Sequence, residues 1–328
     1  MHAPLELVVT PPAPADPGDL DRSAIVRASF ARGPVAIARG DRAGFWFRRF
    51  GIARAGDWPA AALRAAAPAG HVLCADPVHL AVSGDTVVLD ATAAATVGAD
   101  EADALIARLN AHFATDGWRF AAVTPGQWLL ETPAPIDATT TPLADAHARP
   151  LDATLPAGAA ARALRRALNE AQMLLFDCPV NAARAARGVA PINGVWLWGG
   201  GTCAARTAPA AAAVRMVWSD QRHVQQLACR AGGAAAPLPP DAAALPVADG
   251  AAAIDLDLSL ADPATWAQTA LTHWIEPLAR VPAPVQLTVV HPDAALGVRL
   301  RPHDFLARWR RGSLARRLAA AGLAGRDT

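Results

Sequence analysis

The sequence predicts an α/β protein built from mixed α+β layers, and three observations support this class. Residues 71–132 read as strands, then one helix, then strands again, which is typical of a helix packed on a mostly antiparallel sheet. From residue 157 onward, helices and strands follow one another along the chain. Hydrophobic residues make up 53% of the 328 residues and charged residues only 18%, so the chain can bury a substantial core.

The order of these segments suggests three parts. Residues 1–70, with a short strand at 5–9, form a variable N-terminal part of the α/β core. Residues 71–156 form an α+β subdomain whose layered portion is 71–132. Residues 157–328 form a second α/β part, which carries a motif block and a C-terminal helix.

The elements of 71–132 are the clearest. Residues 71–90 predict two or three strands, with Ser83-Gly84-Asp85 as a hairpin turn. A helix capped by Asp100 follows and ends before Gly117. Its apolar residues fall at helical spacing: Ala102, Leu105, Ile106, Leu109 and Phe113. WRFAAV and QWLLET then read as strands around Thr124-Pro125-Gly126.

A motif block follows the polar connection at 133–156. A long helix over 158–176 ends before Pro179, and a short helix reaches Arg187. GVWLW at 194–198 reads as a buried strand that ends in three glycines.

The C-terminal part has one alternating strand and two further helices. IDLDLSL predicts a half-exposed strand, with its leucines facing a core and Asp255 and Asp257 facing solvent. Asp262-Pro263 begins a helix that extends to about 280. VQLTVV and GVRLRP read as strands, and a basic amphipathic helix over 303–322 is expected to pack on the core.

Composition narrows the classes of function. The formal net charge is +1, so no overall field favours nucleic acid. No apolar run is long enough for a membrane span, and the N-terminus does not read as a signal peptide. The four cysteines form no C-x-x-C pair. We therefore expect a cytoplasmic protein with reduced thiols, no cofactor and no bound metal.

The motif block supplies the candidate ligand site. Asn181 and Arg184 share one face of the short helix, and an arginine fork beside amides suits a carboxylate or a phosphate. The residues predicted to bind an anionic metabolite are Asn181, Arg184, Arg187, Asn193, Gly199, Gly200 and Gly201. A supporting shell is formed by Asn169, Glu170, Gln172, Trp196 and Trp198. In the alternative interpretation, Asn181 caps a helix and Asn193 serves a turn.

Two further patterns in the sequence are weaker. Asp76 and His79 are candidate catalytic residues, because an Asp and a His near a strand end can move protons, although Asp76 before a proline is also a turn signal. Gly199 to Ala204 fits the loose dinucleotide pattern, but no convincing crossover helix follows it.

The segments CADPVHL, NEAQMLL and PVNAARAARGVAPINGVWLWGGG closely resemble the RpfE-type regulatory proteins of bacteria, over roughly residues 70–230. That family is in turn similar to the archaeal-type cofactor-independent phosphoglycerate mutases of the alkaline-phosphatase superfamily. Their matching positions fall on Asn181, Arg184, Gly188, Asn193 and Gly199–Gly201. The resemblance implies an alkaline-phosphatase-like core and a segment that handles a phosphorylated small acid.

The departures from that family bear on activity. Those mutases use two divalent metals held by Asp and His residues, but their N-terminal Asp-Gly motif has no counterpart here, and few Asp and His residues follow the block. The resemblance therefore implies a degenerate core without a working metal centre, in a regulatory or accessory protein that binds a phosphorylated or carboxylated metabolite. Two alternatives remain: a metal-dependent phosphotransferase with rearranged ligands that include Asp76 and His79, and a protein-interaction module.

Overall fold

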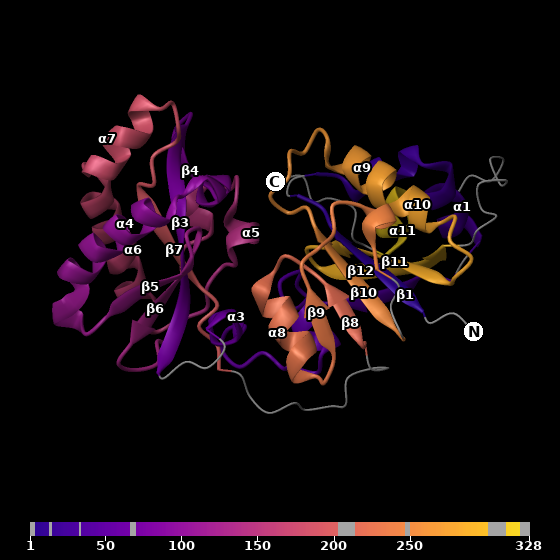
Figure 1. The fold of residues 1–328 in the computed structure, drawn as a ribbon, viewed down its shortest axis with the longest axis horizontal. Helices are drawn as coiled ribbons and strands as arrows, with labels where there is room; N and C mark the ends of the chain where they lie inside the picture. The colour runs from indigo at the N-terminus through magenta and orange to yellow at the C-terminus, as the bar shows by residue number, and fades with distance from the viewer. Residues whose placement is uncertain are drawn as a thin grey trace. The chain divides into compact units, whose positions relative to one another are not determined.

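The computed structural model describes residues 4–12, 15–32, 34–65, 70–202, 214–246, 250–300 and 313–321. It confirms the α/β class, because helices and strands of two sheets make up the fold (Figure 1). The chain forms two compact units, one of residues 1–52 and 206–328 and the other of residues 53–205. We call them unit 1 and unit 2. No helix in the described ranges has both the length and the apolar character that a membrane span requires.

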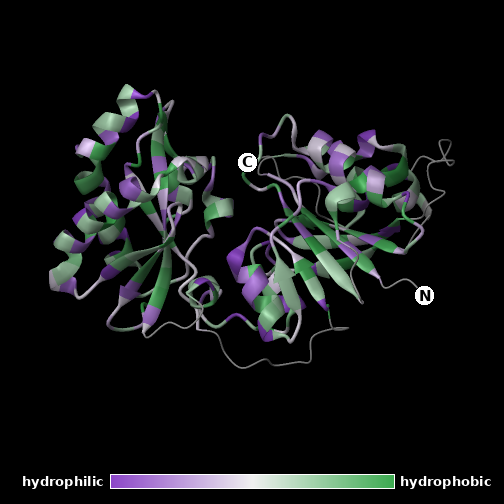
Figure 2. Cartoon of the chain, viewed as in Figure 1, coloured by the Kyte–Doolittle hydropathy of each residue, from purple (hydrophilic) through white to green (hydrophobic). Residues whose placement is uncertain are grey.

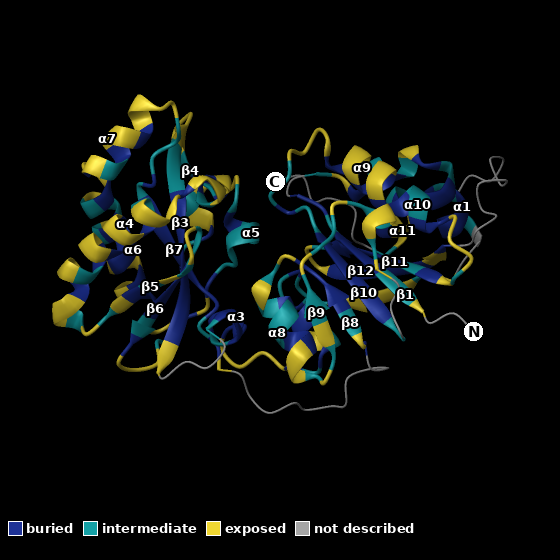
Figure 3. Ribbon diagram, in the orientation of Figure 1, coloured by how far each residue is buried: buried dark blue, intermediate teal, exposed yellow. Residues whose placement is uncertain are grey.

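Unit 1 contains a seven-stranded sheet in the order β2-β12-β11-β1-β10-β8-β9. The bounds of its strands are β1 Leu5–Thr10, β2 Ala36–Arg39, β8 Met216–Trp218, β9 Ala234–Ala236, β10 Ala252–Asp257, β11 Val285–His291 and β12 Ala294–Leu300. The strands from β11 to β9 run parallel, whereas β12 is antiparallel to both β11 and β2. Parallel strands are normally buried on both faces, and the central strands here follow that rule (Figure 3).

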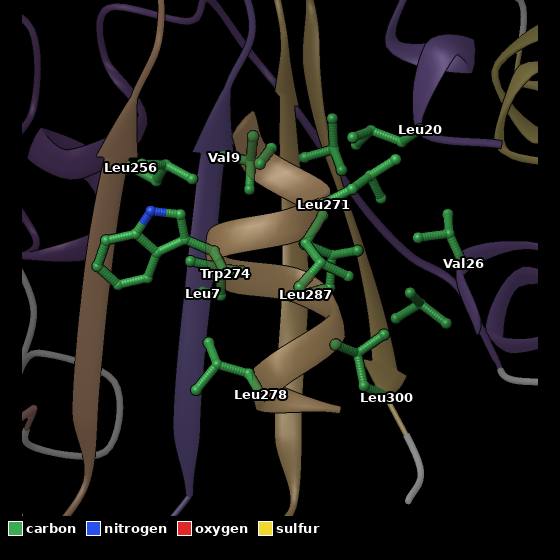
Figure 4. Close-up of a cluster of buried hydrophobic side chains, with 14 of the residues drawn as sticks. Leu7, Val9, Leu20, Val26, Leu256, Leu271, Trp274, Leu278, Leu287 and Leu300 are labelled. Atoms are coloured by element: carbon green, nitrogen blue, oxygen red, sulfur yellow. The ribbon is translucent and has the colours of Figure 1, made fainter. Parts of the chain in front are cut away.

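Helical segments of unit 1 supply the cover for that sheet. They are η1 Pro17–Arg22, α1 Ala24–Arg32, α2 Phe45–Arg49, α8 Arg222–Arg230, η5 Ala242–Ala244, α9 Trp266–Thr269, η6 Ala270–Ile275, α10 Glu276–Leu278 and α11 Leu314–Ala320. Figure 4 shows Trp274 and Leu278 lying over the strand residues Leu7 and Leu287 in the main core. The hydropathy colouring shows the same pattern, with apolar strands beneath helices of mixed character (Figure 2).

Unit 2 contains a five-stranded sheet in which β3 pairs with three other strands. Its strands are β3 His71–Ser83, β4 Thr86–Asp90, β5 Arg119–Thr124, β6 Gln127–Thr132 and β7 Gly194–Trp198. Its helical segments are α3 Ala60–Arg64, η2 Thr92–Thr96, α4 Ala99–Phe113, η3 Ala114–Asp116, α5 Leu143–Ala146, η4 Leu151–Ala153, α6 Ala161–Phe176 and α7 Pro179–Ala186. All five apolar positions predicted for the helix after Gly98 are buried.

The structure divides the chain at other positions than the three predicted parts. β7 pairs antiparallel with β3, so that Trp198 lies opposite Cys74, and α6 packs against β7. Because of this pairing, residues 157–205 belong to the same unit as 71–132. Residues 4–52 instead share a sheet with the last third of the chain, since β1 lies between β10 and β11.

Three local expectations were wrong, and the first is the helix cap at Asp100, because Gly98 is the N-cap of α4 and Asp100 lies inside the helix. Residues 71–83 form one continuous strand, so Asp76 and Pro77 lie inside β3 and not in a turn. The helix expected at Asp262 begins at Trp266, because Asp262 first caps a turn by accepting from the Ala264 N–H. Of the final predicted helix, residues 301–312 and 322 lie outside the described residues, and Leu314 and Leu318 in the described portion are buried as expected.

Candidate functional site

The candidate ligand residues on α7 form hydrogen bonds to other parts of the same chain. Asn181 is buried at the first turn of α7, where its Nδ2 donates to the Leu175 and Ile192 carbonyls and its Oδ1 accepts from the Ile192 N–H. These three bonds join the end of α6, α7 and the start of the segment leading to β7. Asn181 therefore satisfies backbone groups of the segments on either side of α7, and it does not cap α7, whose N-cap is Cys178.

Arg184 is fully buried, and its guanidinium has partners on each nitrogen. Nε donates to the Ala190 carbonyl, Nη2 donates to Thr96 Oγ1, and Nη1 lies 2.5 Å from Oε2 of Glu101. Arg187, which is largely exposed, donates to the other oxygen of Glu101. Both arginines thus pair with the Glu101 carboxylate, and these ion pairs join α7 to α4.

Glu101 provides the carboxylate that pairs with both arginines. Burial alone would raise the pKa of Glu101, but the Gly98 N–H, Arg187 and Arg184 together lower it below its ordinary value. The chain therefore supplies its own carboxylate where an anionic ligand was predicted.

Asn193 and the three glycines also contact the protein itself. Asn193 donates to the Leu80 carbonyl and accepts from the Leu80 N–H, which extends the β3–β7 pairing through a side chain. The Gly199 N–H donates to Thr140 Oγ1, and the Gly201 N–H donates to the Trp58 carbonyl. A Cβ on Gly201 would lie 1.9 Å from the Asp57 carbonyl oxygen. Gly201 is therefore explained by close backbone approach, and Gly199 by its positive φ of 71°.

The two tryptophans of β7 are buried, and Trp198 donates a hydrogen bond to a member of a buried ion pair. Trp196 Nε1 donates to the Thr141 carbonyl, and Trp198 Nε1 donates to Asp76 Oδ2. Asp76 also pairs with Arg64 of α3, whose guanidinium lies 5.5 Å from the Trp198 ring centroid. Burial by itself would lower the pKa of Arg64, but Asp76 raises it above its ordinary value.

The remaining predicted residues lie apart from this pair. His79 Nδ1 lies 3.0 Å from the Pro191 carbonyl oxygen, and no interaction joins its ring to Asp76. Asn169 is exposed on α6, where Glu170 contacts His112 and Arg166. The predicted site residues thus divide among several separate networks, and their role as a ligand site stays a prediction.

A different cluster lies at the carboxyl end of the parallel strands in unit 1. On β10, Ile254 and Leu256 face the main core, and Asp255 points to the opposite face. Asp255 is nevertheless only 3% exposed. The prediction of a half-exposed strand was therefore wrong, because this second face is covered as well.

The carboxyl group of Asp255 joins two further elements. Its Oδ1 accepts from Trp46 Nε1 of α2 at 2.9 Å, and its Oδ2 accepts from the Ser219 hydroxyl at 2.7 Å, directly after β8. Ser219 Oγ in turn accepts from the Gln221 N–H at the start of α8. We call this chain of hydrogen bonds the Asp255 network.

A second carboxyl group extends the Asp255 network toward the strand end. Asp257 Oδ2 accepts from Gln221 Nε2 at 3.0 Å, and Oδ1 accepts from the Ser259 N–H at 2.9 Å. Asp257 is partly exposed, whereas Ser219 and Ser259 are buried. The edge therefore presents one accessible carboxylate next to a buried one.

The electrostatics of this edge are unusual for an aspartate pair. Burial raises the pKa of Asp255 to about 7, and the nearby Asp257 carboxylate acts in the same direction. Hydrogen bonds from Ser219 and Trp46 oppose the shift, because they favour the charged form. Ligands of open α/β sheets bind outside the carboxyl ends of parallel strands. The position of Asp255 and its raised pKa therefore both indicate a ligand site at this edge of the sheet.

The sequence offered one signal for this edge. Residues 251–254 are AAAI, and an unbroken apolar run before an Asp is typical of a strand buried on both faces. The contributions of Trp46 and Ser219 had no such signal, because both are distant in sequence from Asp255.

Within the described ranges, no three His, Cys, Asp or Glu side chains lie close enough to hold a metal ion.

The solved structures that are similar to this chain include two that cover most of its length. No family model matches the chain, and no curated protein matches it. A cofactor-independent phosphoglycerate mutase from Thermoplasma acidophilum DSM 1728 is 14% identical with a TM-score of 0.41, covering 92% of this chain and 90% of that one. The PH0037 protein from Pyrococcus horikoshii is 12% identical with a TM-score of 0.49, covering 97% and 92%. At this degree of likeness, the function has to be inferred from the residues of this chain.

Proposed function

We propose that this chain is a regulatory or accessory protein that binds a small polar metabolite at the carboxyl end of β1, β8 and β10. The observation that carries the proposal is the buried Asp255 beside the accessible Asp257. A buried carboxyl group costs several kcal/mol compared with an apolar residue of similar size, so a strand that only built a core would not need one. The resemblance of the motif block to the RpfE-type proteins supports a regulatory role.

The side chains at this edge favour a ligand that presents hydroxyl or amino donors. Asp257 and Asp220 offer acceptor oxygens near Asp255, and both retain some exposure. The phosphorylated small acid implied by the resemblance would meet the like charges of Asp257 and Asp220 here, so it fits this edge less well than a neutral or cationic ligand. Arg184, which was expected to bind the acid group, is already paired with Glu101.

The test is a thermal-shift screen of the whole protein with hydroxy acids, their phosphate esters, polyols and amino compounds, each with and without Mg²⁺. A ligand at 100 times its Kd should stabilise the protein by about 2.7 kcal/mol. We expect Asp257→Ala to abolish the shift and Arg187→Ala to leave it in place. The matched variant is informative because Arg187 lies in the motif block and is largely exposed.

The opposite pattern would place the ligand at the motif block. A shift that survives Asp257→Ala and disappears with Arg187→Ala would overturn the proposed location. A screen without any shift would count against a metabolite-binding role and in favour of a protein-interaction module.

A further inference from the structure

We propose that Asp255 and Ser219 form a proton-operated switch, in which uptake of one proton by Asp255 reverses the hydrogen bond of the Ser219 hydroxyl. The inference goes beyond the proposed function, because it rests on the Asp255 network and requires no ligand. It concerns a buried carboxyl group at the junction of β10, the end of β8 and α2.

The hydrogen-bond geometry determines which oxygen receives the proton. Trp46 Nε1 can only donate, so Asp255 Oδ1 must remain an acceptor. Oδ2 faces the Ser219 hydroxyl, which can donate or accept. A protonated Oδ2 therefore donates to Ser219 Oγ, and the hydroxyl hydrogen of Ser219 turns away from Oδ2.

The reversal reaches the start of α8. Ser219 Oγ already accepts from the Gln221 N–H, and Gln221 Nε2 donates to Asp257. When Asp255 is protonated, Ser219 Oγ accepts two hydrogen bonds, whereas with Asp255 ionised it accepts one and donates one. Proton uptake thus changes the bonding of the residue that fixes the first turn of α8, beside the accessible Asp257.

Burial is the largest cause that favours the protonated form of Asp255, and nearby carboxylates act in the same direction. Asp257 and Asp220 are carboxylates close enough to raise the pKa of Asp255, and burial contributes more than either. On the same sheet face, Glu6 of β1 is paired with Arg49 of α2. His223 of α8 also lies against α2, where its ring stacks on Phe47 with 5.7 Å between the ring centroids.

The sign of the pH dependence follows from linkage. With a pKa raised from 3.8 to about 7, the folded state holds a proton that the unfolded state has lost between these values. Stability is therefore highest below about pH 4 as far as this group is concerned. It falls as the pH rises to about 7, with the unfolding equilibrium constant increasing up to tenfold per pH unit.

The experiment measures chemical unfolding of the whole protein from pH 4.5 to 8.5. For wild type we expect the stability to fall as the pH rises to about 7, and for Asp255→Asn we expect this pH-dependent loss to disappear. Asp257→Asn should keep the pH-dependent loss of stability, but the loss should be complete at a lower pH, because the Asp257 charge no longer raises the pKa of Asp255. Two matched variants, His223→Gln and the exposed Asp262→Asn, should leave this loss in place.

Carboxyl ¹³C NMR titration of the wild type provides a second readout that does not depend on any variant folding. An aspartate that titrates near pH 7 and is missing from the Asp255→Asn spectrum supports the switch. The proposal is overturned if all aspartate signals of wild type titrate below pH 5, or if His223→Gln removes the pH dependence. A failed ligand screen would not affect either result, so the two proposals fail separately.

Discussion

Arg184 shows how one residue can satisfy a pattern without performing its predicted chemistry. A guanidinium flanked by amides was expected to bind an anion, and it does bind one, namely the carboxylate of Glu101 in the same chain. The spacing between Asn181 and Arg184 was correctly interpreted as one helix face, and both are buried on it. What the sequence could not show is that Glu101 of α4, 83 residues earlier, supplies the partner.

Replacing Arg184 should therefore lower the free energy of unfolding of the protein. Arg184→Ala removes the guanidinium that is bonded to Ala190, Thr96 and Glu101, and leaving such partners unpaired costs about 1 to 3 kcal/mol. Chemical denaturation should show this loss, while Arg187→Ala, at the exposed end of the same carboxylate, should cost less than about 1 kcal/mol. Equal midpoints for Arg184→Ala and wild type would refute the structural role.

At the scale of elements, the glycine turn after β7 resembles a phosphate-binding loop in sequence and differs from one in its contacts. Its Gly199 and Gly201 N–H groups donate to Thr140 and Trp58. Asp57 accepts from the Trp58 N–H and from the Thr140 N–H and hydroxyl. The turn, the Thr140 loop and the segment before α3 are thus fastened together around one buried carboxylate.

Gly201→Ala should be strongly destabilising for this reason. The added Cβ would lie 1.9 Å from a carbonyl oxygen of the backbone, so either the turn or the segment at Asp57 has to move. Overpacking of this kind costs about 1 to 3 kcal/mol. Gly70→Ala is the matched control, since its Cβ would meet only the Thr132 carbonyl oxygen at 3.8 Å. Thermal unfolding of the two variants should differ accordingly, and similar melting temperatures would contradict the close approach.

At the scale of the whole molecule, unit 2 is a continuous segment set between two segments of unit 1. The chain enters it after residue 52 and leaves it near residue 205. Inside unit 2 these two ends are held side by side, because the Ala61 N–H donates to Gly199 and the Gly201 N–H donates to Trp58. Adjacent ends are typical of a domain that can be inserted into another.

Residues 53–205 expressed alone should therefore fold. We expect a single cooperative unfolding transition by circular dichroism, with the ion pair of Arg64 and Asp76 intact inside the fragment. An Arg64→Ala fragment is the control that should lose stability. A soluble fragment without a cooperative transition would show that unit 2 depends on unit 1.

The sequence by itself determined the local order of unit 2 and several of its buried positions. Leu105, Leu109 and Phe113 were identified from helical spacing, and the β7 strand from its apolar run, because periodicity and glycine positions are local properties.

Only the tertiary structure decided which charged and polar side chains meet. Glu101 with Arg184, Asp76 with Arg64, and Asp255 with Trp46 and Ser219 join residues separated by 12 to 209 positions. The alternation of β10 was visible in the sequence, but whether its Asp255 face met water depended on α2 and the end of β8. A carboxylate becomes a solvated surface group, an internal ligand or a proton acceptor according to the partners that folding brings to it, and no local pattern records those partners.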